Sequence, residues 1–210
     1  MPGLYTHMAF AKRINEKVEM NNEELMIGSV AADVCYRKNK MESHFGTRIV
    51  KASPEQFYEK YQEEVQTPFG LGYLSHLYLD SVFYDRLISK NYQLLEGKSY
   101  IDGQAVFLDK RLNQVKTFQE VYFGDNIYRD YALTNYDLCR DYHIQYFYPT
   151  ENIKETKIVE IDDKKIPEIN QQLEMYKPEK IEGRTHCFEY FQLKDFLEES
   201  CENFIQKYIK

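Results

Sequence analysis

Residues 70–80, which read GLGYLSHLYLD, are apolar on almost every side of an expected helix. A helix of this composition belongs in the interior of a protein. It nevertheless carries His76 and Asp80, four residues apart and therefore on one face. Removing an imidazole and a carboxylate from water is costly unless each gains a partner. Either the two side chains form a buried His–Asp pair, with water at a helix end, or they bind a metal ion such as zinc.

Hydrophobic periodicity and helix-start signals predict helices along most of the chain. The expected helices are 3–20, 23–36, 54–66, 68–90, 104–123, 127–139 and 185–208. Residues 37–53 and 91–103 are predicted loops, and Gly124-Asp125-Asn126 is a predicted helix break. The pattern therefore indicates an all-α protein.

One segment departs from this pattern, because residues 149–184 are charged and contain three of the six prolines. We expect an irregular, lid-like insertion with a short strand pair around Asp162-Asp163. A chain of 210 residues suits one domain. We therefore expect a single domain over residues 1–210 that includes this insertion.

The formal net charge of −7 disfavours a broad basic surface, so nucleic acid is not an expected partner. The four cysteines show no C-x-x-C spacing and are predicted to be free, buried thiols in a reducing compartment. The sequence shows no secretory signal pattern and no apolar run near ~20 residues. We expect a cytoplasmic protein without a transmembrane segment, and its oligomeric state stays open.

Three further residues resemble the pair on 70–80, because each is the odd polar residue in or beside a core-like segment. His7 starts the first helix, Asp33 ends the apolar run IGSVAAD, and His44 follows a polar loop in the motif SHF. Taken alone, Asp33 is either a cap for the following turn or a functional carboxylate. A buried cluster of three imidazoles and two carboxylates has little reason to exist without a cation.

Together these motifs, over about residues 2–84, resemble the zinc-dependent phospholipase C family and its short bacterial hydrolases. The resemblance implies an all-α, phospholipase C/P1 nuclease-like helical bundle with the metal site between helices. It implies that Asp33, His44, His76 and Asp80 bind one zinc ion and that His7 shares Asp80 with a second metal. It also implies that Asp33 is the general base that orients the attacking water.

The chain departs from the secreted phospholipases, which hold a further zinc with an H-x-x-x-E pair. Here His143 is followed four residues later by Phe147, and His186 by Tyr190. We therefore expect one or two zinc ions. His143, His186 and Asp130 remain candidate substrate-binding residues at the border of the site. The tyrosine-rich helix 127–139 either packs in the core or lines the pocket.

The sequence thus predicts a metal-dependent hydrolase, in particular a phosphoesterase that uses zinc-activated water. The alternative is a non-catalytic descendant that binds metal or acts as a scaffold. An HD-type phosphohydrolase is disfavoured, because the chain contains no adjacent His-Asp dipeptide. The substrate is either a lipid or a small soluble phosphoester, and residues 149–184 are expected to shape that choice.

Overall fold

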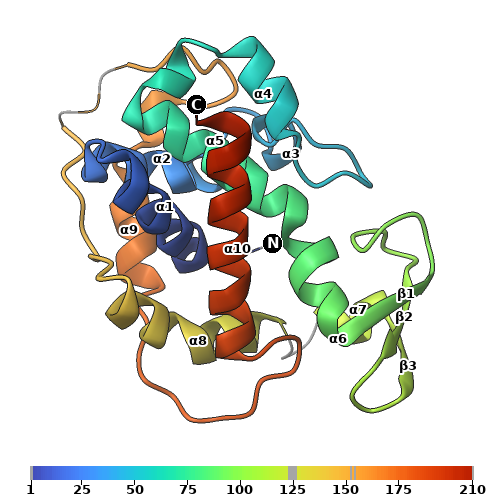
Figure 1. The fold of residues 1–210 in the computed structure, drawn as a ribbon. Helices are drawn as coiled ribbons and strands as arrows, with labels where there is room; N and C mark the ends of the chain where they lie inside the picture. The colour runs from blue at the N-terminus through green and yellow to red at the C-terminus, as the bar shows by residue number, and fades with distance from the viewer. Residues whose placement is uncertain (1, 123–126, 152, 154, 210) are drawn as a thin grey trace.

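The computed structural model describes residues 2–122, 127–151, 153 and 155–209, so the predicted break at Gly124-Asp125-Asn126 lies outside the described residues. Helices dominate these ranges, and the predicted all-α class is confirmed, with one small sheet added (Figure 1). The helices are α1 (Leu4–Val18), α2 (Asn22–Val34), α3 (Lys40–Ser43), α4 (Pro54–Lys60), α5 (Pro68–Phe83), α6 (Ser89–Asn91), α7 (Phe118–Tyr122), α8 (Ile127–Asp141), α9 (Glu168–Met175) and α10 (Tyr190–Tyr208).

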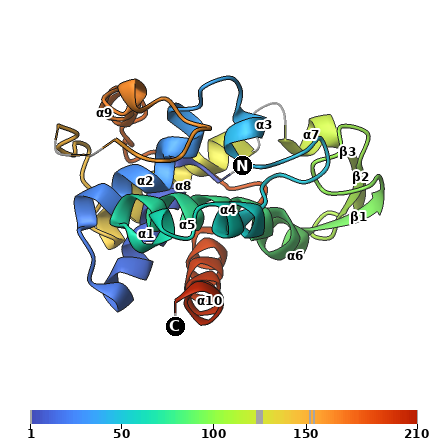
Figure 2. The same cartoon turned by 90° about the horizontal axis from the view of Figure 1, so that it is seen from above.

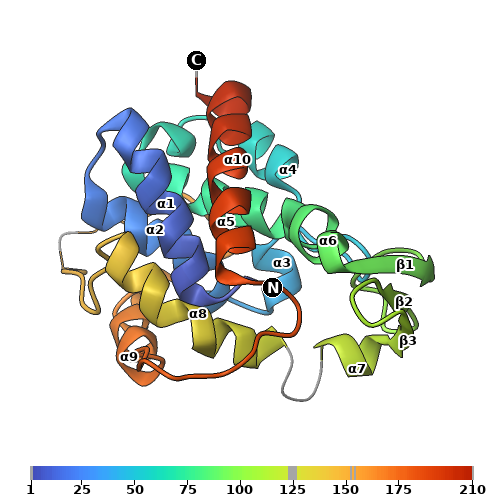
Figure 3. The ribbon, with the colours of Figure 1, turned by 60° about the horizontal axis from the view of Figure 1, so that its bottom comes forward.

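The apolar stretch of the sequence forms α5, which is buried along almost its whole length. Helices α1, α4 and α10 pack around it, and α2 crosses it (Figures 1 and 3). Two glycines permit the crossing of α2 and α5. A Cβ atom on Gly28 would lie 2.1 Å from the carbonyl oxygen of Phe69, and one on Gly72 would lie 2.2 Å from that of Leu25. Real Cβ atoms do not approach so closely, so the two backbones meet only because both residues lack a side chain.

The predicted loop 91–103 and helix 104–123 are wrong in large part. These residues form an antiparallel sheet of β1 (Tyr92–Glu96), β2 (Val106–Asp109) and β3 (Gln114–Thr117), which lies to one side of the helices (Figures 1 and 3). Of the predicted helix, only α7 remains.

The turn between β2 and β3 explains this error. The carboxylate of Asp109 accepts hydrogen bonds from the main-chain N–H groups of Arg111 and Leu112, and Asn113 adopts a left-handed φ of 51°. Asp and Asn are the residues that favour such turns. The turn reverses the chain, so the apolar residues before and after it pair across two strands instead of lying on one helical face.

Residues 149–184 contain a helix, α9, that the sequence did not predict, and it packs against α2 (Figure 2). The predicted strand pair around Asp162-Asp163 is wrong, because the described backbone there makes a single isolated bridge between Tyr36 and Ile161. Glu160 ties this segment to the helical body, since its carboxylate accepts hydrogen bonds from Lys60 and Tyr61 at 2.6 Å each.

One further difference from the prediction concerns the start of the last helix. The last helix begins at Tyr190, with a capping box between Glu189 and Gln192, and not near residue 185.

The four cysteines, as predicted, are buried free thiols. Within the described part of the chain, no helix combines the length and the apolarity that crossing a membrane requires.

Candidate metal centre

The five predicted ligands come from four separate segments and lie together in the folded chain. His7 lies in the first turns of α1, Asp33 near the end of α2, His44 directly after α3, and His76 and Asp80 on α5. The two histidines of α1 and α5 are fully buried, and the exposed fraction of the Asp33 side chain, 12%, is the largest of the five. The close crossing of α2 and α5 at their glycines brings Asp33 toward His76.

The side chains of His44, His76 and Asp80 bring their ligand atoms close together, and Asp33 approaches them at His44. The Nε2 atom of His44 lies 3.0 Å from Nε2 of His76 and 3.3 Å from Oδ2 of Asp80. It also lies 3.5 Å from Oδ1 of Asp33, and Nε2 of His76 is 3.9 Å from Oδ2 of Asp80. Ligands about 2.0–2.1 Å from a tetrahedral zinc ion are separated from one another by roughly 3.3 Å. The separations among His44, His76 and Asp80 therefore suit three ligands of one ion, and Asp33 approaches the same group at His44.

The hydrogen bonds of the two imidazoles fix which nitrogen faces the other ligand atoms. Nδ1 of His76 donates to the carbonyl of Ser29 at 2.8 Å, and Nδ1 of His44 donates to the carbonyl of Lys40 at 2.5 Å. A carbonyl only accepts, so in each neutral ring the proton is on Nδ1 and the lone pair is on Nε2. Two lone pairs 3.0 Å apart repel each other unless a cation or a proton lies between them. A metal-binding histidine typically makes such an outer hydrogen bond.

His7 and Asp80 show the same need for a cation. Both ring nitrogens of His7 and both oxygens of Asp80 are buried without a hydrogen-bond partner among the described residues. Nε2 of His7 lies 3.6 Å from Oδ1 of Asp80, and its ring stacks on His76 with centroids 3.8 Å apart. Leaving such groups unpaired in the interior is costly. The donor set therefore fits a metal ion on the His7 side as well.

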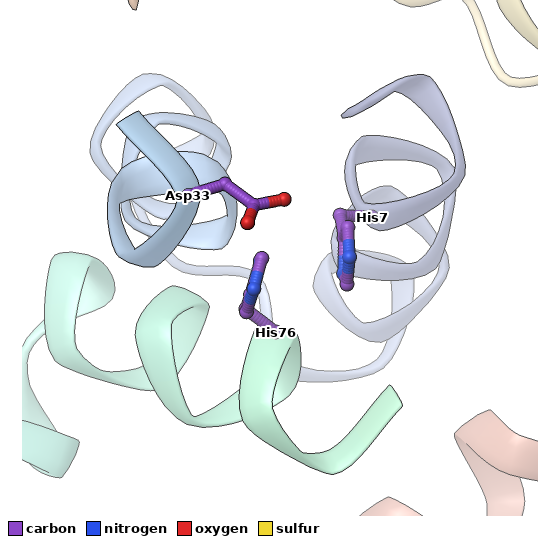
Figure 4. Close-up of side chains that lie close together, drawn as sticks. All are labelled: His7, Asp33 and His76. Carbon is purple, nitrogen blue, oxygen red and sulfur yellow. The ribbon is translucent and has the colours of Figure 1, made fainter. Parts of the chain in front are cut away.

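The ligand atoms form two overlapping groups, one of His7, Asp33 and His76 and the other of His44, His76 and Asp80, each within 4.8 Å. In Figure 4 the carboxylate of Asp33 points into the space between His7 and His76. The groups share His76, but this ring has one free nitrogen and can bind only one ion. A carboxylate has two oxygens, and those of Asp80 face opposite sides, Oδ1 toward His7 and Oδ2 toward His44. Asp80 is therefore the better bridging ligand.

Burial and mutual contacts set the protonation of the cluster. Burial lowers the pKa of His7 well below its usual value and also lowers that of His76. Burial would lower the pKa of His44 too, but its contacts with the carboxylates of Asp33 and Asp80 raise it to about 9. For Asp33, burial acts to raise the pKa, yet the contacts with His44 and His76 hold it well below the usual range. Without metal, the proton on His44 thus supplies the positive charge between the carboxylates.

A cavity of about 620 Å³ adjoins the cluster at Asp33. Its wall combines the start of α1, the tyrosine-rich helix α8, α9 and the loop that follows α9. The described lining residues are Pro2, Gly3, Leu4, Tyr5, Asp33, Val34, Lys40, Tyr128, Tyr131, Ala132, Asn135, Gln172, Tyr176, Lys177, Pro178, Glu179 and Ile181. The helix 127–139 of the sequence prediction thus contributes both to the core and to the pocket.

The three remaining candidates lie elsewhere. The buried carboxylate of Asp130 accepts hydrogen bonds from the main-chain N–H groups of His186, Cys187 and Phe188. The side chains of His143 and His186 are exposed, and neither residue is among those that line the cavity. The structure therefore brings none of these three into the ligand cluster.

Sequence reasoning did not single out Lys40, Tyr128 or the loop 176–181 as parts of the site. Lys40 lies in a polar loop, and the loop after α9 has no periodic pattern. The one signal in the sequence is proximity: Lys40 follows Asp33 by seven residues and precedes His44 by four. Whether this spacing brings Lys40 close to Asp33 in space depends on how the chain turns after α2, which the sequence does not reveal.

Comparison with known protein families gives a match over nearly the whole chain. A family model described as zinc dependent phospholipase C matches residues 6–210, which is nearly the whole chain. No curated protein and no solved structure matches. The matched range contains all five residues of the ligand cluster.

Proposed function

The chain belongs to the zinc-dependent phospholipase C family, and on this premise we propose that it hydrolyses a phosphoric ester, either a diester or a monoester. The observation that carries the proposal is the pair of facing Nε2 atoms of His44 and His76 beside the buried carboxylate of Asp80, which lies 3.3 Å from Nε2 of His44. Zinc is the family's metal, and these groups are positioned to bind a metal ion. The cavity that adjoins them offers a substrate direct access to Asp33.

In this proposal His44, His76, Asp80 and Asp33 hold one zinc ion, and His7 binds a second together with Asp80. Bound zinc supplies a water ligand with a pKa near ~7 and a positive charge for the phosphoryl oxygens. The neutral rings of His7 and His76 already have the protonation that a ligand needs, because burial lowers their pKa values. His44 has to release a proton before it can bind.

Asp33 is the proposed catalytic residue, because it belongs both to the ligand cluster and to the cavity wall. Its Oδ1 atom lies 3.5 Å from Nε2 of His44. Contacts with His44 and His76 hold its pKa low, so the carboxylate is ionised at neutral pH. We propose that its second oxygen orients the attacking water and takes its proton.

The cavity favours a substrate of limited size. Its volume of about 620 Å³ is typical of a site for one small ligand. Tyr176, Lys177 and Ile181 belong to the segment expected to shape specificity, and they form part of the wall. Both a lipid head group and a soluble phosphoester satisfy this description. The buried free thiols are in keeping with a cytoplasmic location.

Metal content combined with hydrolysis tests the proposal. The purified full chain should contain zinc and hydrolyse a chromogenic phosphodiester or phosphomonoester. Asp33→Asn should lower kcat by about 10²-fold or more, as expected for loss of a general base, whereas Asp102→Asn on the exposed β1–β2 loop should have no effect. If the chain binds zinc tightly but hydrolyses no phosphoester, the proposed enzymatic function is wrong. That outcome would favour the scaffold alternative, which is also supported by the lack of a second histidine followed four residues later by Asp or Glu.

A further inference from the structure

Lys40 places a positive charge beside the ligand cluster. It is the first residue of α3, and its Nζ atom lies 3.0 Å from Oδ1 of Asp33. The same oxygen lies 3.5 Å from Nε2 of His44. An ammonium group has three donors and no acceptor, so Lys40 does not bind a metal ion. It therefore stands next to the proposed zinc position without being part of it.

The main chain of Lys40 has a separate role from its side chain. Its carbonyl accepts the hydrogen bond from Nδ1 of His44 and another from the hydroxyl of Ser43. The first of these bonds joins the start of α3 to a residue of the ligand cluster. Because the carbonyl belongs to the backbone, a substitution of the side chain leaves the orientation of His44 intact.

The other charged residues of the cavity do not duplicate this position. Among the described lining residues, Lys177 is the second cation, and its Nζ atom lies over the ring of Tyr146, 5.1 Å from the centroid. Glu179 is an exposed acid, and Asp33 is already in contact with Lys40. Lys40 is thus the cation of this wall that contacts a proposed metal ligand.

We propose that Lys40 binds a non-bridging oxygen of the substrate's phosphoryl group. The identity of that group rests on the proposed function. Lys40 lines the cavity, and its side chain is about half exposed. Asp33 accepts one of the three ammonium hydrogens, which leaves two donors for a substrate. Lysine is a common phosphate ligand, and hydrogen bonds between charged partners are about twice as strong as neutral ones. Lys40 is therefore a substrate-binding residue that acts beside the metal ions.

The test measures binding of inorganic phosphate to the zinc-loaded full chain by titration calorimetry. Lys40→Gln should weaken phosphate binding by about tenfold or more while zinc content stays unchanged. Lys38→Gln is the matched control. It removes the same charge from the same segment, but its side chain is 72% exposed and pairs with Glu42. The control should bind phosphate within about twofold of the unmodified chain.

Each other outcome contradicts the proposal. If Lys40→Gln binds phosphate as tightly as Lys38→Gln does, Lys40 is not a phosphate ligand. If Lys40→Gln loses zinc, the side chain supports the metal site instead of the substrate. Hydrolysis assays separate the two proposals. If the unmodified chain hydrolyses a phosphoester and Lys40→Gln does so with the same kinetics, only the role of Lys40 is rejected. A zinc-loaded chain that binds phosphate through Lys40 but hydrolyses no ester rejects only the proposed function.

Discussion

The Nε2 atoms of His44 and His76 face each other at 3.0 Å, although the Nδ1 atom of each ring is already hydrogen-bonded to a main-chain carbonyl. Two neutral imidazoles in this arrangement direct lone pairs at each other, which is stable only with positive charge between them. The nearby carboxylates of Asp33 and Asp80 increase that need. The ligand cluster is therefore arranged for a cation.

The first prediction concerns metal stoichiometry. If two ions bind, His76→Ala should lose one ion, because the ring offers a single free nitrogen. His7→Ala should lose only the ion on its own side. Asp80→Ala should lose both, because its two oxygens face His7 and His44 separately. Metal analysis of the purified variants by mass spectrometry measures this difference. Full metal content in Asp80→Ala would contradict the bridging role of Asp80. The control is His143→Ala, which replaces an exposed histidine outside the cluster and should keep all metal.

The second prediction concerns the pH dependence of zinc binding. The pKa of His44 in the metal-free protein is raised to about 9, so at pH 7 its ring is protonated. Zinc needs the Nε2 lone pair, so binding must release that proton. Between pH 6.5 and 8 the apparent affinity should rise by about tenfold per pH unit for one released proton. Calorimetry in two buffers with different protonation enthalpies counts the protons, and equal enthalpies in both would contradict the prediction.

The third prediction concerns the crossing of α2 and α5. Gly72→Ala should lower the free energy of unfolding by roughly 3 kcal/mol or more, because its methyl group would meet the main chain of Leu25 at 2.2 Å. It should also weaken zinc binding, since the crossing aligns Asp33 with His76. Urea unfolding of the metal-free protein measures the first effect. Gly103→Ala is the control, because a Cβ there meets no atom within 4 Å. Equal stability of the two variants would show that the helices tolerate a wider separation.

The fourth prediction separates a structural role of Asp130 from a substrate-binding role. Its carboxylate accepts three main-chain hydrogen bonds from residues 186–188, just before α10. Asp130→Asn replaces one acceptor oxygen by a donor and should destabilise the protein by about 2–4 kcal/mol. Zinc content and KM should not change. Asp137→Asn, on the same helix but in a partly exposed ion pair with Arg140, should cost less than about 1 kcal/mol. A raised KM in Asp130→Asn at unchanged stability would restore the substrate-binding role.

Most of the helices and the cluster of buried polar residues proposed as ligands were accessible from the sequence. Each ligand is an isolated polar residue in an apolar segment, and burying such a residue requires a partner. The i, i+4 spacing of His76 and Asp80 places both on one face of α5 whatever the rest of the chain does. The all-α class follows from the same helical periodicity, and the family match over residues 6–210 agrees with it.

The sheet was missed because the apolar residues Val106, Leu108, Leu112 and Val115 fit a helical period, although Val106 and Leu108 lie in β2, Val115 in β3 and Leu112 in the turn between them. The Asp109 turn and the left-handed Asn113 decide between them, and both act through the main chain. Helix α9 was missed because it is short and lies among prolines and charges.

The sequence specifies which side chains must be satisfied in the interior, because polarity and helical spacing are local properties. The tertiary structure decides which of them meet: the two glycines set the approach of α2 to α5, and α3 returns His44 and Lys40 to Asp33. The cavity wall depends on the same long-range packing, since it joins the start of α1 to α8 and to the loop after α9. Contacts between segments so far apart in the chain leave no local pattern, and so only the folded structure reveals them.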